Sequence, residues 1–358
     1  MTGITSNLPA PQHGPRPLPL FLAYLWRETE NDPLLRQAAL RGLRRYQEIP
    51  RPSLVRPHRI NATRGGSRLL HLAPDDGGAA ARQAVVLVPS LVNSHMILDL
   101  SDGMSLARHL AGAGFDPWLI DWGTPRPEDA SLDLAGHVEH RLVPLIRSIG
   151  RPASLVGYCL GGTMVLGAAA LVDPVSVATI AAPWHFDRYP ETERKRIADL
   201  WQQSQPLCER LGYVPMEVLQ NGFWSLDPVR TVRKYAAFAD MEPGSETERA
   251  FLAVEDWANE GAPLSYAAGR DLFEHLYGGN ATGEGRWTIG GRAVSPQALS
   301  CPTLSIRSTT DRIVPADAAP PLNVRRDSPL GHVGMVVSRK APEQIWRVLS
   351  DWLSSPDQ

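Results

Sequence analysis

A cysteine lies between two glycines in the stretch LVGYCLGGTMV, residues 155–165, where an apolar run passes into a run of small residues. The apolar run predicts a β-strand that ends at Tyr158, and the following residues favour a helix. A nucleophile on such a turn is held at the carboxyl edge of a sheet, where open α/β folds bind ligands. Gly157 and Gly161 allow a strained turn and close helix packing, and the helix N-terminus favours a thiolate and a developing oxyanion. The pattern therefore predicts that Cys159 is a nucleophile.

Two residues further along the chain can complete the set that a cysteine nucleophile needs. The segment STTDRIVP, residues 308–315, contains Asp311, and the segment GHVGMVV, residues 331–337, contains His332. The chain order nucleophile, acid, histidine is that of α/β-hydrolase sites. In such a site His332 takes the thiol proton as a base and later returns it as an acid. Asp311 fixes the tautomer of the imidazole and stabilises its charged form.

Other residues compete for each of these roles. The competitors are Asp317 and Asp327 for the acid, His185 and His275 for the histidine, and Cys208 and Cys301 for the nucleophile. Asp311 is preferred because it directly follows an expected strand. The two other histidines fall in a segment between the expected strands, and the two other cysteines lack flanking glycines, so we expect them to be packing residues. Cys159 itself has a plain alternative as a small buried apolar residue.

A tetrahedral intermediate at Cys159 needs two backbone donors for its oxyanion. The N–H of Leu160, the residue after the nucleophile, is the first candidate. The second should come from the loop PSLVNSHMILDL, residues 89–100, with Leu91 as the preferred residue and Val92 as the alternative. The apolar run of this loop, without a glycine doublet, is atypical of small esterases.

The elements that must position these residues alternate along the chain. We expect strands at 84–90, 115–122, 153–158 and 176–183, and helices at 101–114, 131–150 and 160–171. Such alternation requires crossover connections and a parallel sheet covered on both faces. The alternation of strands and helices is absent for about 115 residues. It then resumes with a strand at 302–309 and an amphipathic helix at 341–353. The sequence therefore predicts an α/β-hydrolase-type, mostly parallel sheet with helices on both faces and a helical cap insertion.

The expected order of strands and helices divides the chain into four parts. They are a helical and irregular N-terminal extension at 1–82, a first part of the core at 83–183, a cap or lid insertion at 184–300 and a second part of the core at 301–358. Within the extension we expect helices in 19–49 and an early strand in 67–74, and Ser101 is the candidate cap of the first core helix.

Composition excludes several classes of function. The chain has 358 residues, 43% of them hydrophobic and 21% charged, and a net charge of −2, so nothing favours nucleic acid or an anionic membrane. No apolar run is long enough for a transmembrane helix, and the N-terminus lacks a signal-peptide pattern. Three widely spaced cysteines form neither a disulfide framework nor a metal site, which indicates a reducing, cytoplasmic setting.

The expected cap is rich in aromatic residues. They are Trp184, Phe186, Phe223, Trp224, Trp257, Phe273, Tyr277 and Trp287. We expect most of them to form the core of the cap, and some to line an apolar tunnel for an acyl chain. A cap of this length also predicts a lid that moves to admit substrate, with residues 190–230 as its candidate part.

Four segments together resemble one known family. They are GYCLGGT, LVPSLVNSHMILDLSDGMSLARHLAGAGFDPWLIDWGTP, FLAVEDWANEGAPLSYAAGRDLFEHLYGGN and TTDRIVP. They resemble the polyhydroxyalkanoate synthases, a branch of the α/β-hydrolases with a cysteine nucleophile, over residues 84–337. The resemblance implies polymerisation of (R)-3-hydroxyacyl-CoA with release of CoA. The catalytic cysteine, aspartate and histidine of the family match Cys159, Asp311 and His332 by motif.

The resemblance also implies the partners of the protein. They are a hydroxyacyl-CoA substrate, a growing polyester chain, and either a second copy of the chain or a second synthase subunit, at a polyester granule surface. No cofactor or metal is expected, because the CoA thioester is the substrate. Departures from the family pattern, such as the separation of Trp257 and Asn259 in DWANEG, leave two alternatives. These are a cysteine-dependent esterase, thioesterase or depolymerase, and a non-catalytic granule-binding or partner-binding protein.

Overall fold

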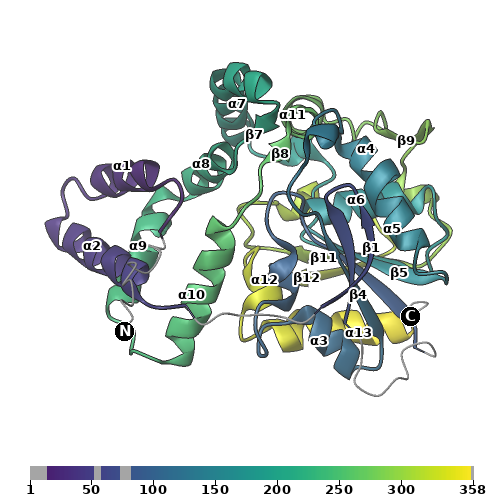
Figure 1. Ribbon diagram of the computed structural model, residues 1–358, viewed down its shortest axis with the longest axis horizontal. Helices are drawn as coiled ribbons and strands as arrows, with labels where there is room; N and C mark the ends of the chain where they lie inside the picture. Colours follow the sequence, from purple (N-terminus) through teal and green to yellow (C-terminus); the bar gives the residue numbers. More distant parts are fainter. Residues whose placement is uncertain (1–13, 52–57, 73–81, 356–358) are drawn as a thin grey trace, which may run out of the picture. The chain divides into compact units, whose positions relative to one another are not determined.

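The computed structural model describes residues 14–51, 58–72 and 82–355 (Figure 1). The chain divides into two compact units. One unit consists of Met1–Pro57 together with Phe223–Asn259, and the other of His58–Gly222 together with Glu260–Gln358.

The larger unit is built on an eight-stranded sheet with the order β1-β2-β4-β3-β5-β6-β11-β12. Its strands are β1 (Arg59–Arg64), β2 (Ser67–His71), β3 (Ala84–Val88), β4 (Asp116–Asp121), β5 (Ala153–Tyr158), β6 (Val177–Ile180), β11 (Thr303–Ser308) and β12 (Val324–Ser328). Strand β2 is antiparallel to both of its neighbours, and all other neighbours are parallel. The predicted α/β-hydrolase-type, mostly parallel sheet is therefore confirmed.

The central strands are continuous apolar runs, as expected for strands covered on both faces. Every residue of β3, β4 and β5 is buried. Figure 1 shows α5 and α6 on one side of the sheet and α3 and α13 on the other. The helices of this core are α3 (Leu106–Gly112), α4 (Leu134–His137), η4 (Val138–Leu142), α5 (Val143–Arg147), α6 (Leu160–Ala169), α12 (Gly334–Val337), η9 (Pro342–Trp346) and α13 (Arg347–Ser354).

The structure corrects three expectations about these elements. Strands β1 and β2 belong to the sheet, so the boundary predicted at residue 82 falls inside the core. Strand β12 was not expected, because its residues VRRDS are mostly exposed and carry no apolar alternation. Helix α3 begins later than predicted: Ser105 caps it by accepting a hydrogen bond from the N–H of Arg108, while Ser101 pairs with Met104.

The segments between β6 and β11 in this unit form further short elements. They are α7 (Glu191–Leu211), β7 (Tyr213–Val214), β8 (Leu264–Ser265), α11 (Tyr266–Arg270), η6 (Asp271–Gly278), β9 (Thr288–Ile289) and β10 (Arg292–Ala293), with α8 (Met216–Leu226) at the boundary of the two units. Single-turn helices are η2 (His95–Asp99), η3 (Pro127–Asp129), η5 (Phe186–Arg188), η7 (Pro296–Ala298) and η8 (Ala316–Ala318). Strands β7 and β8 pair, and Trp201 of α7 stacks on Phe273 of η6 at a centroid distance of 4.8 Å.

The smaller unit consists of α1 (Leu18–Glu28), α2 (Pro33–Glu48), α9 (Pro228–Ala239) and α10 (Glu246–Asn259). Its core is an apolar and aromatic cluster of Phe21, Tyr24, Leu25, Ala39, Leu43, Tyr46, Trp224, Val232, Tyr235, Phe238 and Leu252. The carboxylate of Asp256 accepts hydrogen bonds from the Tyr46 hydroxyl at 2.6 Å and from the guanidinium of Arg51 at 2.7 and 3.0 Å. The N-terminal helices therefore share a core with residues 223–259, and the segment predicted as one cap contributes to both units.

Within the described residues, no helix combines the length and the apolar character that crossing a membrane requires.

Candidate active site

Cys159 occupies the turn between β5 and α6. Its backbone has φ +56° and ψ −132°, a left-handed conformation that L-residues other than glycine rarely adopt and that is often found at functional sites. The N–H of Cys159 donates to the carbonyl of Ile180 at 2.9 Å, so the sheet fixes the strained residue from the β6 side. This is the geometry expected for a nucleophile held above the carboxyl edge of the sheet.

The glycines around Cys159 are required by close backbone approach. A Cβ at Gly157 would lie 2.4 Å from the Cα of Gly162, so the strand and the helix meet there without side chains. A Cβ at Gly161 would lie 2.2 Å from the carbonyl oxygen of Val88. The first turn of α6 therefore packs directly against the end of β3, beside the loop that was expected to complete the oxyanion hole.

Asp311 and His332 meet beyond the ends of β11 and β12. The Nδ1 of His332 lies 2.6 Å from the Oδ2 of Asp311, and both side chains are buried. The Oδ1 of Asp311 accepts hydrogen bonds from the N–H groups of Ile313 at 2.7 Å and Val314 at 3.1 Å. A carboxylate can only accept, so Nδ1 of His332 carries a proton, and its Nε2 is left to hydrogen-bond the thiol of Cys159.

The electrostatics of His332 follow from these contacts. Burial alone would lower its pKa, but the charges of Asp311 and Cys159 and the hydrogen bonds with both outweigh burial and raise the pKa to about 10. The site therefore favours the imidazolium form of His332 beside the carboxylate of Asp311. The structure thus brings together the three side chains that the sequence singled out.

The competing candidates lie in other surroundings. Asp317 is exposed, and Asp327 pairs with Arg307 at 2.8 Å, which lowers the pKa of that carboxyl. His275 contacts Asp271 at 2.7 Å, and burial lowers the pKa of His185. Cys208 and Cys301 have thiols whose pKa values are raised by burial. None of the six contributes to the cluster of Cys159, Asp311 and His332.

The two backbone N–H groups that the sequence singles out for an oxyanion are those of Leu160 and Leu91. Among the residues that the structure describes, neither the N–H of Leu160 nor that of Leu91 has a hydrogen-bond partner. The N–H of Val92, by contrast, donates to the hydroxyl of Ser90 at 3.3 Å. This contact favours Leu91 over Val92 as the second donor, and Ser90 is the residue that sequence reasoning missed here.

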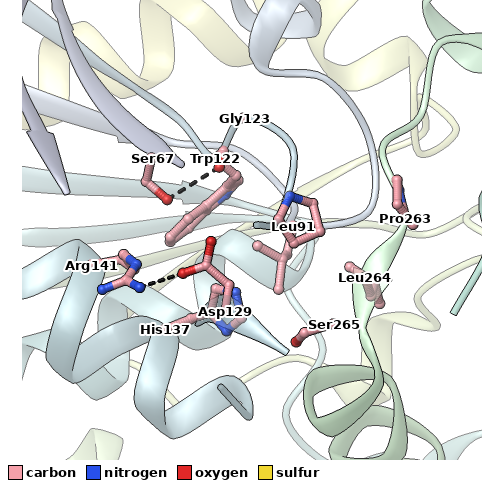
Figure 2. A pocket seen from close by; sticks show the side chains of 11 residues that line it. Ser67, Leu91, Trp122, Gly123, Asp129, His137, Arg141, Pro263, Leu264 and Ser265 are labelled. Atoms are coloured by element: carbon pink, nitrogen blue, oxygen red, sulfur yellow. Dashed lines mark hydrogen bonds and ion pairs between the residues drawn. The ribbon is translucent and has the colours of Figure 1, made fainter. Parts of the chain in front are cut away.

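Leu91 also lines a cavity beside the end of β4 (Figure 2). Arg141 forms an ion pair with Asp129 in it, and the hydroxyl of Ser67 donates to the carbonyl of Trp122 at 3.1 Å. Its free volume of about 20 Å³ suits a water-sized group rather than an acyl chain. Cys159, Asp311 and His332 are not among its lining residues.

The aromatic residues of the expected cap form separate groups. Trp224 packs against Phe21 and Tyr24 in the smaller unit, at centroid distances of 5.9 and 6.2 Å. In the larger unit, Phe186 and Tyr277 lie 4.9 Å apart, and both contact Tyr189. Tyr189 was missed by the sequence reasoning, because nothing in HFDRYP distinguishes it from an ordinary core aromatic.

Within the described parts of the chain, no group of three or more His, Cys, Asp or Glu side chains is arranged to hold a metal ion. The cluster of Cys159, His332 and Asp311 is explained by its mutual hydrogen bonds, which suit nucleophilic catalysis.

Comparison with known proteins identifies sequence relatives of this chain. The chain is 30% identical over 287 residues to the poly(3-hydroxyalkanoate) polymerase subunit PhaC of Haloferax mediterranei, which covers 75% of this chain and 58% of that protein. It is 28% identical over 286 residues to the PhaC subunit of Haloarcula marismortui, covering 75% of this chain and 60% of that one. The PhaC subunit of Allochromatium vinosum is 28% identical over 300 residues, which cover 78% of this chain and 83% of that protein. The chain thus spans less than two thirds of the length of the first two relatives.

Solved structures with a similar chain trace include a monoacylglycerol lipase of Paleococcus ferrophilus, with a TM-score of 0.49, 16% identity and coverage of 76% of this chain and 94% of the lipase. An esterase of Thermogutta terrifontis has a TM-score of 0.46 and 14% identity, and the match covers 85% of this chain and 100% of the esterase. At these values the likeness bears on neither substrate nor mechanism. No protein-family model matches the chain. The resemblance to the polyhydroxyalkanoate synthases that the motifs indicated is confirmed by the sequence relatives.

Proposed function

We propose that this relative of the poly(3-hydroxyalkanoate) polymerase subunits is an acyltransferase that polymerises (R)-3-hydroxyacyl-CoA and releases CoA. The observation that carries the proposal is the arrangement of Cys159, His332 and Asp311 on an α/β-hydrolase-type sheet, in a chain whose relatives are named as polymerase subunits.

In the first half-reaction the thiolate of Cys159 attacks the thioester carbonyl of the substrate. The N–H groups of Leu160 and Leu91 hold the developing oxyanion. When the intermediate collapses, the carbon–sulfur bond to CoA breaks, and the departing thiolate takes a proton from His332. One thioester is exchanged for another, so the step is nearly balanced in free energy.

In the second half-reaction a hydroxyl group attacks the acyl group on Cys159. His332, now neutral, accepts the hydroxyl proton, and Asp311 stabilises the imidazolium that forms. An ester bond forms, the bond to sulfur breaks, and Cys159 returns as a thiolate. Cysteine suits this step better than serine, because a thioester is a better acyl donor than an oxygen ester.

The acyl-enzyme gives a direct test of this proposal. Protein mixed with 3-hydroxybutyryl-CoA and quenched rapidly should gain the mass of one or more hydroxybutyryl units, and peptide mapping should locate them on Cys159. The Cys159→Ala variant is the control and should gain nothing. A mass gain that persists in that variant would contradict Cys159 as the acyl carrier.

A second copy of the chain or a second synthase subunit as partner, and a location at a polyester granule surface, remain predictions from the resemblance, and a cytoplasmic setting remains a prediction from the cysteine content.

A further inference from the structure

The chain that leaves β6 crosses the edge of the sheet next to the nucleophile. It begins at Ile180, whose carbonyl accepts the N–H of Cys159, and Ala181 turns it with a left-handed φ of +49°. The hydroxyl of Thr163 in α6 donates to the carbonyl of Pro183 at 2.6 Å. Residues 181–189 are therefore anchored at their start to the turn that carries Cys159.

The same segment is also fixed to the elements on its other side. The N–H of Trp184 donates to the carbonyl of Ala318 at 2.7 Å, in the loop that follows Asp311. The N–H of Phe186 donates to the side-chain oxygen of Asn280 at 2.8 Å. The segment is thus fixed on one side to the nucleophile turn and on the other to the loop that follows the catalytic acid.

Tyr189 ends this segment and carries a buried hydroxyl. Its residue exposure is 3%, its ring stacks on Phe186 at 5.7 Å, and it meets the ring of Tyr277 edge-on at 5.2 Å. The hydroxyl is next to that of Tyr277 but has no hydrogen bond of standard geometry among the described residues. A buried phenol that makes no hydrogen bond of standard geometry has lost its contact with water without full replacement, so it is a natural donor to a bound ligand.

The charges at the active site reach this hydroxyl. Burial raises the pKa of Tyr189 well above its ordinary value, and the charges of Tyr277, Cys159 and Asp311 act in the same direction. The phenol therefore stays protonated at any pH at which the enzyme works. It offers a hydrogen-bond donor among the rings of Phe186 and Tyr277.

We propose that Tyr189 is a specificity-determining residue whose hydroxyl donates a hydrogen bond to the 3-hydroxyl of the acyl chain on Cys159. The inference rests on the proposed function. The carbonyl oxygen of the acyl group is assigned to the N–H groups of Leu160 and Leu91, so the 3-hydroxyl is the polar group of the acyl chain that still needs a partner. A site built to bond a substrate hydroxyl discriminates against the analogue that lacks it, because the protein group is then left unpaired.

The test compares two substrates in three proteins. With protein in excess over substrate, the rate of the single CoA release that accompanies acylation of Cys159 is measured with 3-hydroxybutyryl-CoA and with butyryl-CoA, for the wild type, for Tyr189→Phe and for Tyr266→Phe. The last is the matched control, because the hydroxyl of Tyr266 already accepts a hydrogen bond from Gln205 at 2.6 Å. Tyr189→Phe should lower the rate constant of acylation about 10-fold for the hydroxylated substrate and less than 2-fold for butyryl-CoA, and the control should change neither. An equal loss for both substrates, or no loss for either, would overturn the proposal.

Binding separates this inference from the proposed function. In a Cys159→Ala background, calorimetry gives the Kd of both CoA esters with Tyr or Phe at position 189. A preference for the hydroxylated ester that disappears with Phe supports the role of Tyr189, even if the wild type turned over neither ester. Equal preferences in the two proteins would contradict it.

Discussion

At the residue scale, the presence of a cysteine rather than a serine at position 159 leads to the sharpest prediction. Cys159→Ala should lower CoA release at least about 10⁴-fold, because no other group can hold the acyl chain.

Cys159→Ser should lose polymer formation while keeping weak CoA release, because an acyl-serine is an oxygen ester and its transfer to a hydroxyl gains nothing from thioester energy. CoA release and polymer yield are measured side by side. Polymer made by the serine variant at a near wild-type rate would contradict the thioester argument.

The raised pKa of His332 predicts how stability depends on pH. The group binds a proton in the folded protein up to about pH 10 and in the unfolded chain only up to about 6.5. Its stabilising contribution is therefore complete below about 6.5 and is lost as the pH rises through about 10. Between these values the free energy of unfolding should fall with rising pH relative to His332→Gln, by at most roughly 1.4 kcal/mol per pH unit. Urea unfolding of both proteins from pH 6 to 10 measures this difference, and parallel curves would refute the assigned protonation state.

At the element scale, the contact between α6 and the end of β3 should couple stability to activity. In Gly161→Ala the new methyl group would meet the backbone of Val88 and Pro89. We expect a loss of about 1–3 kcal/mol in the free energy of unfolding and a lower kcat/KM, because the amides of Leu160 and Leu91 move apart. Gly112→Ala in α3 is the control, since its Cβ would meet nothing within 4 Å. Full activity in Gly161→Ala would show that this contact does not shape the oxyanion hole.

Much of the core could be predicted from local sequence, because its strands are continuous apolar runs and the nucleophile turn carries its glycines with it. Strand β1 and strand β12 could not, since their residues are mostly exposed and are strands only through their neighbours in the sheet. Leu91 was already the preferred second donor from the sequence, and what the sequence could not show is the contact of Val92 with Ser90 that supports this choice. Such features depend on tertiary contacts rather than on periodicity.

The association of Cys159, Asp311 and His332, by contrast, could be predicted from the sequence. Each follows a strand directly or by a short segment, and parallel strands bring their carboxyl ends to one edge, so chain order was enough to associate them. The unpaired hydroxyl of Tyr189 lacked any such signal, because pairing is a property of the folded surroundings.

At the scale of the whole molecule, the smaller unit depends on helices that are distant in sequence. A Cβ at Gly42 of α2 would lie 1.8 Å from the carbonyl oxygen of Tyr235 in α9, so the two helices meet at backbone distance. Gly42→Ala should destabilise this unit by about 3 kcal/mol. Gln37→Ala, on the exposed side of the same helix, should change stability by less than about 0.5 kcal/mol.

Limited proteolysis, followed by mass spectrometry, measures this effect for each part of the chain. Cleavage within α1, α2, α9 or α10 should increase in Gly42→Ala and stay unchanged in Gln37→Ala. Equal resistance of the two variants would contradict the close packing of α2 on α9.

The reaction with 3-hydroxybutyryl-CoA tests the central claim most directly. Purified protein is incubated with the substrate, and free thiol and turbidity are followed together, with His332→Gln as the inactive control. The account predicts that the wild type releases CoA while insoluble polyester accumulates, and that the control does neither at a comparable rate. Release of CoA accompanied only by free 3-hydroxybutyrate, with no polymer at any protein concentration, would contradict it and identify the protein as a hydrolase.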